Sequence, residues 1–392
     1  MKLFKLQDIL PQLPGLIIRR HFKFKFERIP FEVDGLAPKK IRNFFLAGLN
    51  QYLLPSKPLG YPVVAQIEPA NFCNLSCPLC LTTSETAARP AGLLSVERFQ
   101  EFIDDLGDYL LLIVLWNWGE PFLNPGLLKM ISTAKAKKIV VHSSTNGQVR
   151  FDEGMAGGIV ESGLDSLVFG IDGATQETYA QYRKGGNLET VLENVRSLVA
   201  AKKSKGSPTP RLTLRFVAMQ HNEKELPLAY QLAKELGVDF FAVKTVDMPP
   251  ALGRNLDRLF APGNEAFQRY EYDRESFQRK KRSFTCMRPW KRIALDALGE
   301  IIPCEYDYRN VHSFGGLKSG ERALSIWRGS RGREFRKKFN KGNNDYYLCK
   351  NCTYKNRVAE DCTIALVELR RPDGAPGGAN PYYEQAKSSR KS

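Results

Sequence analysis

The sequence predicts an α/β protein: an open, partial (β/α)6 barrel of the TIM type, followed by a smaller cysteine-rich region. Three observations predict it. Apolar strands alternate with amphipathic segments from Tyr61 to about Val246, which is typical of parallel βα units. Six such strands can be counted, and a second group of cysteines follows the last one. A closed eight-fold barrel and a doubly wound sheet produce a similar alternation and remain alternatives.

The six strands are expected where short apolar runs are followed by helical or loop sequence. They span 62–68, 111–116, 139–143, 165–171, 211–218 and 238–244. The clearest helix is 188–202, because its apolar residues recur at helical spacing and predict one buried face. A further helix, 222–236, precedes Gly237, an expected helix stop.

Four further segments surround the predicted barrel, which spans 61–248. Residues 1–60 form a basic, Pro-containing appendage in which one or two short helices are expected. Residues 249–285 lose the alternation, become charged and are interpreted as a linker, whereas 286–369 carry the second group of cysteines. The tail 370–392 is rich in Gly, Pro, Ser and Lys, a composition typical of disorder.

Composition is that of a soluble globular protein, since 43% of the 392 residues are hydrophobic and 26% are charged. The longest apolar run, 109–116, is far shorter than the ~20 residues that cross a bilayer. The N-terminus shows no small-residue cleavage site, so a cytoplasmic location is expected. Thiols stay reduced there, and 8 cysteines therefore favour metal or redox ligands over disulfides.

Cys73, Cys77 and Cys80 follow the first predicted strand on one short loop. Thiolates this close in sequence converge on one metal centre, and such thiolates hold iron–sulfur clusters. Three ligands with no fourth thiol nearby would leave one iron of a cubane cluster open to a substrate or cofactor. A structural zinc knuckle, or three reduced and buried cysteines, are the plainer alternatives.

In this position the CX3CX2C loop resembles that of the radical S-adenosylmethionine (SAM) enzymes. The resemblance implies a [4Fe–4S] cluster on Cys73, Cys77 and Cys80, whose open iron chelates the amine and carboxylate of SAM. Leu79 stands where that family usually has an aromatic residue.

Further motifs of the family fall at the carboxyl ends of the next strands, where barrel active sites are built. The segment 118–121, Trp-Gly-Glu-Pro, resembles the Gly-Gly-Glu-Pro motif that holds the SAM amino group, with Trp118 replacing its first glycine. The segment 143–147 resembles the one that lies along the ribose and methionine of SAM. The cofactor-binding residues implied by these two segments are Gly119, Glu120, Pro121, Ser144 and Asn146.

The loop after the fourth strand, Gly-Ile-Asp-Gly at 170–173, and the later Arg183 resemble the SIDG and R.G elements of the subgroup with extra C-terminal clusters. Gly170 stands where a serine is usual. Asp172 and Arg183 are implied as cofactor-binding residues, Arg183 as a partner of the SAM carboxylate. A solvated helix residue is the alternative for Arg183.

The second cysteine region contains a CxxC pair and two remote cysteines, enough for a closed [4Fe–4S] cluster or a tetrahedral zinc site. These are Cys286, Cys304, Cys349 and Cys352. Their spacing up to Cys304 resembles the start of the SPASM and twitch domains of radical SAM enzymes. Because SPASM domains carry more cysteines and a second cluster, the resemblance implies one auxiliary [4Fe–4S] cluster of the twitch-like kind. Cys362 is left over, as a spare thiol or as a replacement ligand.

Glu305 and Asp307 follow Cys304 directly. Carboxylates beside an auxiliary cluster are candidates for catalytic substrate contact or proton removal. Solvated loop acids would show the same pattern.

The resemblance covers roughly residues 61–365 and implies a radical SAM enzyme. Such an enzyme cleaves SAM reductively to a 5′-deoxyadenosyl radical, which abstracts hydrogen from an unactivated carbon of a small-molecule, sugar or lipid-linked substrate. A flavodoxin or ferredoxin is the implied electron donor. A peptide-modifying radical SAM/SPASM maturase is the alternative within the enzymes, and an iron–sulfur or zinc-binding protein without activity is the alternative of another class.

The net charge of +16 favours polyanionic partners, phosphorylated substrates or anionic lipid headgroups. Apolar residues before Arg19 and Arg20 would suit peripheral contact with an anionic membrane on its inner face, although a helix packed on the barrel is the favoured explanation, since packing accounts for most amphipathic segments. The basic run 328–341 has few interleaved aromatic residues, Phe335 and Phe339, which argues against a nucleic-acid partner.

Overall fold

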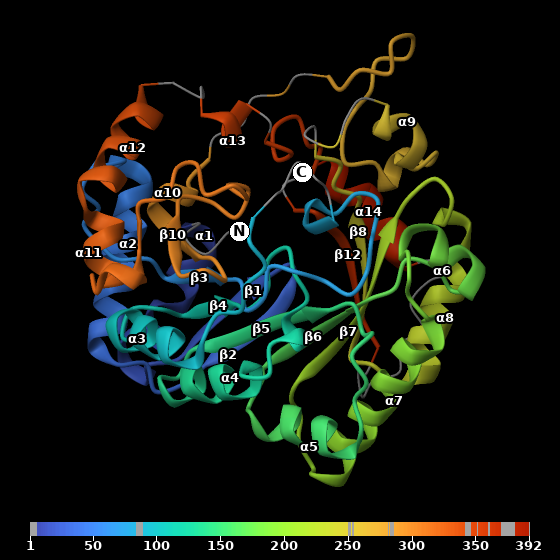
Figure 1. The fold of residues 1–392 in the computed structure, drawn as a ribbon, viewed down its shortest axis with the longest axis horizontal. Coiled ribbons are helices and arrows are strands. Elements are labelled where there is room, and N and C mark those ends of the chain that lie inside the picture. Colours follow the sequence, from blue (N-terminus) through green and yellow to red (C-terminus); the bar gives the residue numbers. More distant parts are fainter. Residues whose placement is uncertain are drawn as a thin grey trace.

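One ten-stranded sheet forms the centre of the computed structural model (Figure 1). The structure describes residues 6–83, 89–249, 252, 255–280, 282, 286–341, 346–350, 352–359, 361–369 and 381–391. Along the sheet the strands follow the order β11-β10-β9-β3-β4-β5-β6-β7-β8-β12. Strands β11 and β12 form the two edges and do not pair with each other, so the sheet is open and does not close into a barrel.

All six predicted strands are present and pair in parallel with one another in sequence order. They are β3 (Val64–Ile67), β4 (Leu112–Val114), β5 (Val140–Thr145), β6 (Ser166–Gly170), β7 (Arg211–Ala218) and β8 (Phe240–Thr245). The predicted α/β fold with a partial barrel is confirmed, and the alternatives of a closed barrel and a doubly wound sheet are not needed.

Helices follow the strands as predicted and pack on the outer face of the sheet. They are α3 (Val96–Leu106), α4 (Leu127–Ala136), α5 (Glu153–Glu161), α6 (Gln176–Tyr182), α7 (Leu188–Ser204) and α8 (Leu226–Leu236), the last after η6 (Glu223–Glu225). Side-chain caps start several of them: Ser95 accepts from the Arg98 N–H, and Asn187 accepts from the Thr190 N–H. Gly237 ends α8 with a φ of 68°, as its position predicts.

The inner face of the sheet is covered by an N-terminal hairpin of β1 (Phe22–Phe26) and β2 (Ile29–Val33). Its buried phenylalanines share one core with inward-facing strand residues such as Val114 and Val168. The sequence analysis expected one or two short helices in this region; short helices are present, but the hairpin was not predicted. The alternation FKFKF is a strand pattern, and the hairpin lies between α1 (Leu6–Ile9), η1 (Leu10–Gln12), η2 (Gly15–Arg19) and the long helix α2 (Pro38–Leu53).

The tip of this hairpin carries a buried ion pair into the barrel. Glu27 and Arg28 take positive φ values of 47° and 68° at the turn. The Glu27 carboxylate accepts from the Lys244 Nζ at 2.8 Å and pairs with the Arg215 Nη1 at 3.5 Å. Burial raises the pKa of Glu27, but these two cations outweigh it and hold the pKa at about 2.

The C-terminal region extends the barrel sheet at both edges. Strand β9 (Arg292–Leu295) pairs in parallel with β3, followed by antiparallel β10 (Glu300–Ile302) and β11 (Gly315–Gly316). At the other edge β12 (Thr363–Glu368) pairs antiparallel with β8. The remaining helices here are α10 (Arg288–Lys291), α11 (Ala323–Arg328), α12 (Ser330–Asn340) and α13 (Tyr347–Lys350), with η9 (Leu317–Ser319). The two cysteine regions therefore share one sheet.

Two segments expected to be irregular are ordered where the structure describes them. The segment interpreted as a linker contains α9 (Leu256–Phe260), η8 (Glu265–Phe267) and the fully buried Tyr270. The tail expected to be disordered forms α14 (Pro381–Lys391), which packs on β12 through the bond from Ser389 Oγ to the Ile364 carbonyl. Residues 370–380 lie outside the described residues. Within the described part of the chain, no helix is long and apolar enough to cross a membrane.

Replacing Glu27 with glutamine should lower the free energy of unfolding at pH 7 by roughly 3 kcal/mol, because two buried cations lose their counter-charge. The folded pKa is depressed, so the contribution is complete above the unfolded value of 4.5 and is lost as pH falls towards about 2. Chemical denaturation of both proteins at several pH values should show the difference shrinking in that window.

Glu32→Gln is the matched control on the same hairpin, because Glu32 pairs with Lys23 at the surface. Its effect should stay below about 1 kcal/mol. Equal losses in the two variants, or a difference independent of pH, would contradict the role given to Glu27.

Candidate active site

The loop with Cys73, Cys77 and Cys80 is held against the loop that follows β4. The Glu120 N–H donates to the Phe72 carbonyl at 3.0 Å. A Cβ atom at Gly119 would lie 2.0 Å from the Ala70 carbonyl oxygen, so only glycine allows this approach. Gly119 and Pro121, expected from the sequence as cofactor-binding residues, therefore shape the loop: Pro121 starts the short helix η5 (Pro121–Leu123).

The three thiols of this loop point into partly or fully buried surroundings. Cys73 Sγ accepts from the Leu75 N–H at 3.4 Å and from Asn146 Nδ2 at 3.3 Å. Cys80 Sγ faces the Trp118 carbonyl at 3.8 Å, just before η3 (Leu81–Thr83). Burial raises the pKa of Cys77 to about 11, against the opposing charge of Arg183. Thiolates in such surroundings need the positive charge of bound metal.

The thiols of this loop are not drawn together as a single zinc ion would draw them. Zinc, with Zn–S bonds of about 2.3 Å in a tetrahedron, draws its thiolates to about 3.8 Å from one another. Within the described part of the chain, no three cysteine thiols lie within 4.8 Å of one another. The wider spacing leaves room for an iron–sulfur cluster on Cys73, Cys77 and Cys80.

Glu120 joins the loop after β4 to the loop after β5. One carboxylate oxygen accepts from the Asn146 N–H at 2.7 Å, and the other accepts from Thr145 Oγ1 at 2.9 Å and the Phe122 N–H at 3.1 Å. Burial raises the pKa of Glu120 to about 7, opposed by these donors. Glu120 therefore holds the two loops together, a structural role that the motif alone did not indicate.

Ser144 and Asn146 lie at the end of β5, as expected, with partners that the sequence did not reveal. Asn146 Nδ2 donates to Asn74 Oδ1 at 2.8 Å as well as to the Cys73 thiol. Ser144 Oγ accepts from Arg215 Nη2 at 3.1 Å, and Arg215 is the partner of Glu27. The hairpin tip is thus connected through one arginine to this edge of the site.

Asp172 and Arg183 form a buried ion pair at the end of β6. The Arg183 Nε donates to Asp172 Oδ2 at 2.6 Å, and Asp172 Oδ1 accepts from the Val217 N–H. The Arg183 side chain is only 15% exposed, so the alternative of a solvated helix residue was wrong. A Cβ atom at Gly170 would lie 2.4 Å from Arg183 Nη2. The guanidinium therefore fills the space that a serine side chain would occupy there.

The second group of cysteines surrounds a cavity of about 180 Å³. Four thiol-bearing residues line it: Cys286, Cys304, Cys349 and Cys352. Burial raises the pKa values of the Cys286, Cys304 and Cys349 thiols, that of Cys349 to about 12. The Arg288 Nη1 donates to Cys304 Sγ at 3.4 Å. The CxxC pair and the two remote cysteines thus meet at one centre, as their number predicts, and four thiols fit a fully ligated cluster.

Cys362 does not line this cavity. It lies just before β12, where its thiol accepts from Arg269 Nη1 at 3.0 Å and its carbonyl accepts from the Thr245 N–H at 2.9 Å. Its inclusion among the metal ligands is therefore not supported by the geometry. Sequence spacing could not separate it from the other four, because all five cysteines follow the barrel.

Glu305 and Asp307 are buried loop acids with fixed partners, not solvated ones. Glu305 forms ion pairs with Arg288 and, at 3.4 Å, with Arg292. Burial raises its pKa, but the two arginines outweigh burial and hold it below its usual range. Asp307 accepts from the N–H groups of Val311 and His312 and so shapes its own loop. The Cys304 thiol donates to the second oxygen of Glu305 at 3.4 Å, so each oxygen of the two carboxylates already has a protein partner.

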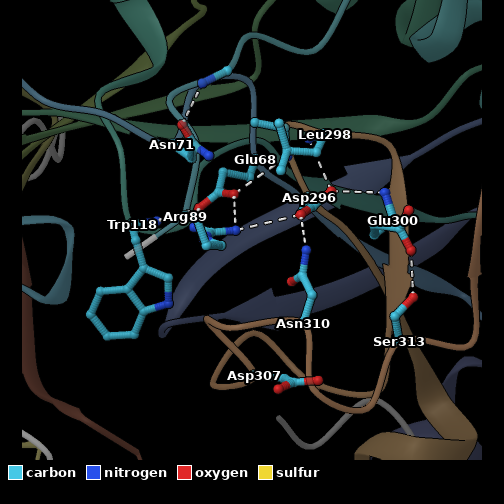
Figure 2. A network of polar contacts seen from close by, with 12 residues as sticks. Glu68, Asn71, Arg89, Trp118, Asp296, Leu298, Glu300, Asp307, Asn310 and Ser313 are labelled. Atoms are coloured by element: carbon cyan, nitrogen blue, oxygen red, sulfur yellow. Dashed lines mark hydrogen bonds and ion pairs between the residues drawn. The ribbon is translucent and has the colours of Figure 1, made fainter. Parts of the chain in front are cut away.

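A buried network joins the two cysteine regions (Figure 2). Glu68, directly after β3, takes two hydrogen bonds of 2.9 Å from the guanidinium of Arg89. Arg89 also pairs with Asp296 of the β9–β10 turn at 3.5 Å, and the Ala297 N–H donates to Glu68 at 3.3 Å. Figure 2 shows Arg89 between the two carboxylates, with Asp307 set apart below. Glu68, which precedes the first cysteine loop, thus contacts the second cysteine region directly.

Asp247 was missed by the sequence analysis. It follows β8, and its Oδ2 accepts from the Tyr306 hydroxyl at 2.6 Å and from Thr353 Oγ1 at 3.2 Å. These partners come from the segments that carry Cys304 and Cys352. Active sites of such barrels lie at the carboxyl ends of the strands, and Asp247 follows the sixth strand. Its position was therefore the signal that could have identified it.

Two family matches cover the two cysteine regions. Residues 67–239 match the radical SAM superfamily, and residues 286–353 match SPASM, an iron-sulfur cluster-binding domain. This chain belongs to the radical SAM superfamily. Its C-terminal region is a SPASM domain, and the resemblance drawn from the CX3CX2C loop is confirmed. Membership brings a [4Fe–4S] cluster with SAM, and the SPASM domain brings auxiliary iron–sulfur binding.

Two relatives are similar to different shares of this chain. Pre-heme d1 synthase of Dinoroseobacter shibae is 31% identical over 43% of this chain and 40% of its own length. The tungsten-containing aldehyde ferredoxin oxidoreductase cofactor-modifying protein of Pyrococcus furiosus is 24% identical over 74% of this chain and 87% of its own length. The chain thus spans less than half of the first relative.

A solved structure shows the same fold. SuiB of Streptococcus suis, in a crystal structure with bound S-adenosylmethionine, superposes with a TM-score of 0.56 at 12% identity, over 80% of this chain and 76% of SuiB. At this identity the likeness concerns the fold.

Cys349→Ala and Cys362→Ala should separate ligand from non-ligand in the SPASM domain. After anaerobic reconstitution, the Cys349 variant should lose about half of the bound iron, because it removes one of four thiolates around one cluster. The Cys362 variant should keep the wild-type iron content. Iron and sulfide assays with electron paramagnetic resonance measure both, and iron loss in the Cys362 variant would contradict the assignment.

Proposed function

We propose that this protein is a radical SAM enzyme that cleaves S-adenosylmethionine reductively and abstracts hydrogen from an unactivated carbon. The observation that carries the proposal is the meeting of Cys73, Cys77 and Cys80 with the loops after β4, β5 and β6, at the carboxyl ends of parallel strands. When bound, the cluster and SAM supply the electron transfer and the radical chemistry.

The residues of the chain position this chemistry. Asn146 orients the Cys73 thiol, and Glu120 fixes the turn on which Asn146 lies. Arg183 lies near Cys77 and is anchored by Asp172, which suits it to pair with the SAM carboxylate. The Trp118 carbonyl, which faces Cys80, is an acceptor suited to an ammonium group.

The SPASM domain is proposed to hold one auxiliary [4Fe–4S] cluster on Cys286, Cys304, Cys349 and Cys352. Four thiolates leave no iron of that cluster open, which favours electron transfer over direct substrate binding. A flavodoxin or ferredoxin is the proposed external electron donor, in the cytoplasm. Glu305 neutralises Arg288 and Arg292 beside Cys304, and any catalytic contact by Glu305 or Asp307 would require their present partners to be displaced.

A small-molecule, sugar or lipid-linked substrate is proposed. The names of the relatives refer to pre-heme d1 and to the cofactor of a tungsten enzyme, and SuiB also has a structure bound to its precursor peptide SuiA. A peptide is therefore the alternative substrate.

The test is the dithionite-dependent formation of 5′-deoxyadenosine from SAM by anaerobically reconstituted protein. The wild type should bind about eight irons, as expected for two [4Fe–4S] clusters, and should form 5′-deoxyadenosine. Cys77→Ala should reduce product to background while the auxiliary cluster stays, because only the first cluster loses a ligand.

Cys362→Ala is the control, since its thiol lies outside both centres, and it should retain SAM cleavage. Zinc in place of iron, with no cleavage by the wild type, would overturn the proposal and leave a zinc-binding protein.

A further inference from the structure

Helix α2 exposes an apolar stripe to solvent, in addition to the apolar residues that it buries. The exposed fractions are 38% for Phe45, 47% for Leu49, 60% for Tyr52 and 62% for Leu53. These positions recur at helical spacing and form one stripe along the second half of the helix. The opposite face is buried and holds Phe44 and Ala47 together with the polar side chains of Lys40, Asn43 and Asn50.

The inner face of α2 is fixed by specific hydrogen bonds, so the outward direction of the apolar stripe is determined. Asn43 exchanges two bonds with the main chain of Tyr61, at 2.8 and 3.2 Å. Asn50 donates to the Gly60 carbonyl at 3.1 Å and accepts from the Leu59 N–H at 2.7 Å. Rotating the helix to bury its leucines would break these bonds and leave buried amides unsatisfied.

Exposed apolar side chains are concentrated in the N-terminal region. Among the described residues, eight of the thirteen large hydrophobic side chains that are exposed lie between Leu10 and Leu59. The other five are scattered over the rest of the chain. Single exposed hydrophobic residues are ordinary, but the four on α2 lie side by side at helical spacing, and a contiguous apolar stripe marks an interaction surface.

The stripe on α2 is bordered by positive charge. The sequence has no acidic residue between Asp34 and Glu68. Arg42 is exposed one turn before Phe45, and Lys57 is exposed just beyond Leu53.

Helix α12 adds a second basic border. Its residue Asn340 donates to the Leu54 carbonyl at 2.6 Å, and Figure 1 shows α2, α11 and α12 together at one side of the molecule. Five basic side chains of α12 and its end are exposed: Arg331, Arg333, Lys337, Lys338 and Lys341. Only Glu334, paired with Lys338 at 2.9 Å, opposes them on this helix.

We propose that the apolar stripe of α2 and the basic face of α12 form a docking surface for an anionic lipid bilayer. Apolar side chains would enter the boundary between headgroups and acyl chains, and the basic residues would lie against anionic headgroups. A second copy of the chain is disfavoured as the occupant, because pairing two α2 stripes would bring two basic α12 helices towards each other. Membrane docking is a property separate from SAM cleavage. It would bring the enzyme to a lipid-linked substrate.

The experiment is sedimentation of the reconstituted full-length protein with vesicles. Wild type should bind vesicles of phosphatidylcholine and phosphatidylglycerol, bind pure phosphatidylcholine vesicles much less, and dissociate as salt is raised. The double variant L49Q/L53Q should bind the anionic vesicles at least about 10-fold more weakly, since it removes the central apolar contacts. L228Q/L259Q is the matched control, with leucines 52% and 63% exposed elsewhere, and should bind like wild type.

A second pair of variants tests the basic face. R333Q/K337Q should weaken binding about 10-fold and flatten its salt dependence, whereas K203Q/K224Q, which removes two exposed lysines from the barrel, should do neither.

Failure of wild type to bind anionic vesicles, or equal binding by L49Q/L53Q, would overturn the proposal. Light scattering that shows a dimer dissociated by L49Q/L53Q, without vesicle binding, would also overturn it and assign the stripe to a contact between copies. Formation of 5′-deoxyadenosine in detergent-free buffer should be unchanged in all four variants. A protein that docks on vesicles yet does not cleave SAM would sink the proposed function alone.

Discussion

The parallel pairing of β9 with β3 is the constraint on which the rest of the site depends. The register places Ile67 beside Leu295, so the two strands end next to each other and their following loops leave from the same edge of the sheet. One of these loops leads to the first cysteine group, and the other is the β9–β10 turn, which carries Asp296 and Ala297. Arg89 then lies between Glu68 and Asp296, one carboxylate from each strand end. Without this arginine, two buried carboxylates would face each other, a repulsion that burial makes severe.

Charge pairing between distant segments recurs around the barrel. Glu27 from the N-terminal hairpin neutralises two cations of the inner sheet face, and Asp172 neutralises Arg183 beside the cluster loop. In each case one partner is held by the sheet and the other is brought by a loop or hairpin. Such pairs contribute little net stability compared with apolar packing, but breaking one leaves an uncompensated buried charge. They therefore fix where a loop lies more than how stable the fold is.

The positions of the six barrel strands and the first cysteine group could be predicted because each depends on local sequence. A buried parallel strand needs only a short apolar run, and a CX3CX2C loop needs only its own spacing. The hairpin 22–33 was missed although FKFKF is a strand pattern, because the basic charge and the prolines of the surrounding segment favoured an irregular appendage. The helix at 381–391 depends on packing against β12, which composition does not record. The exclusion of Cys362 and the partners of Glu305 depend on contacts between residues far apart in sequence, and no spacing rule describes those.

Trp118 shows how a departure from a family motif can be compensated in three dimensions. The position is usually glycine, yet the close approach that demands glycine falls on Gly119, whose neighbour is the Ala70 carbonyl. The side chain of Trp118 points the other way, where its Nε1 donates to the Glu305 carbonyl at 2.7 Å. Its ring packs edge-on against Tyr306 and Tyr308, at 5.7 and 5.0 Å. The backbone of this residue therefore serves the first cysteine loop and its side chain serves the SPASM domain, so the substitution adds a second connection between the two regions beside the Arg89 network.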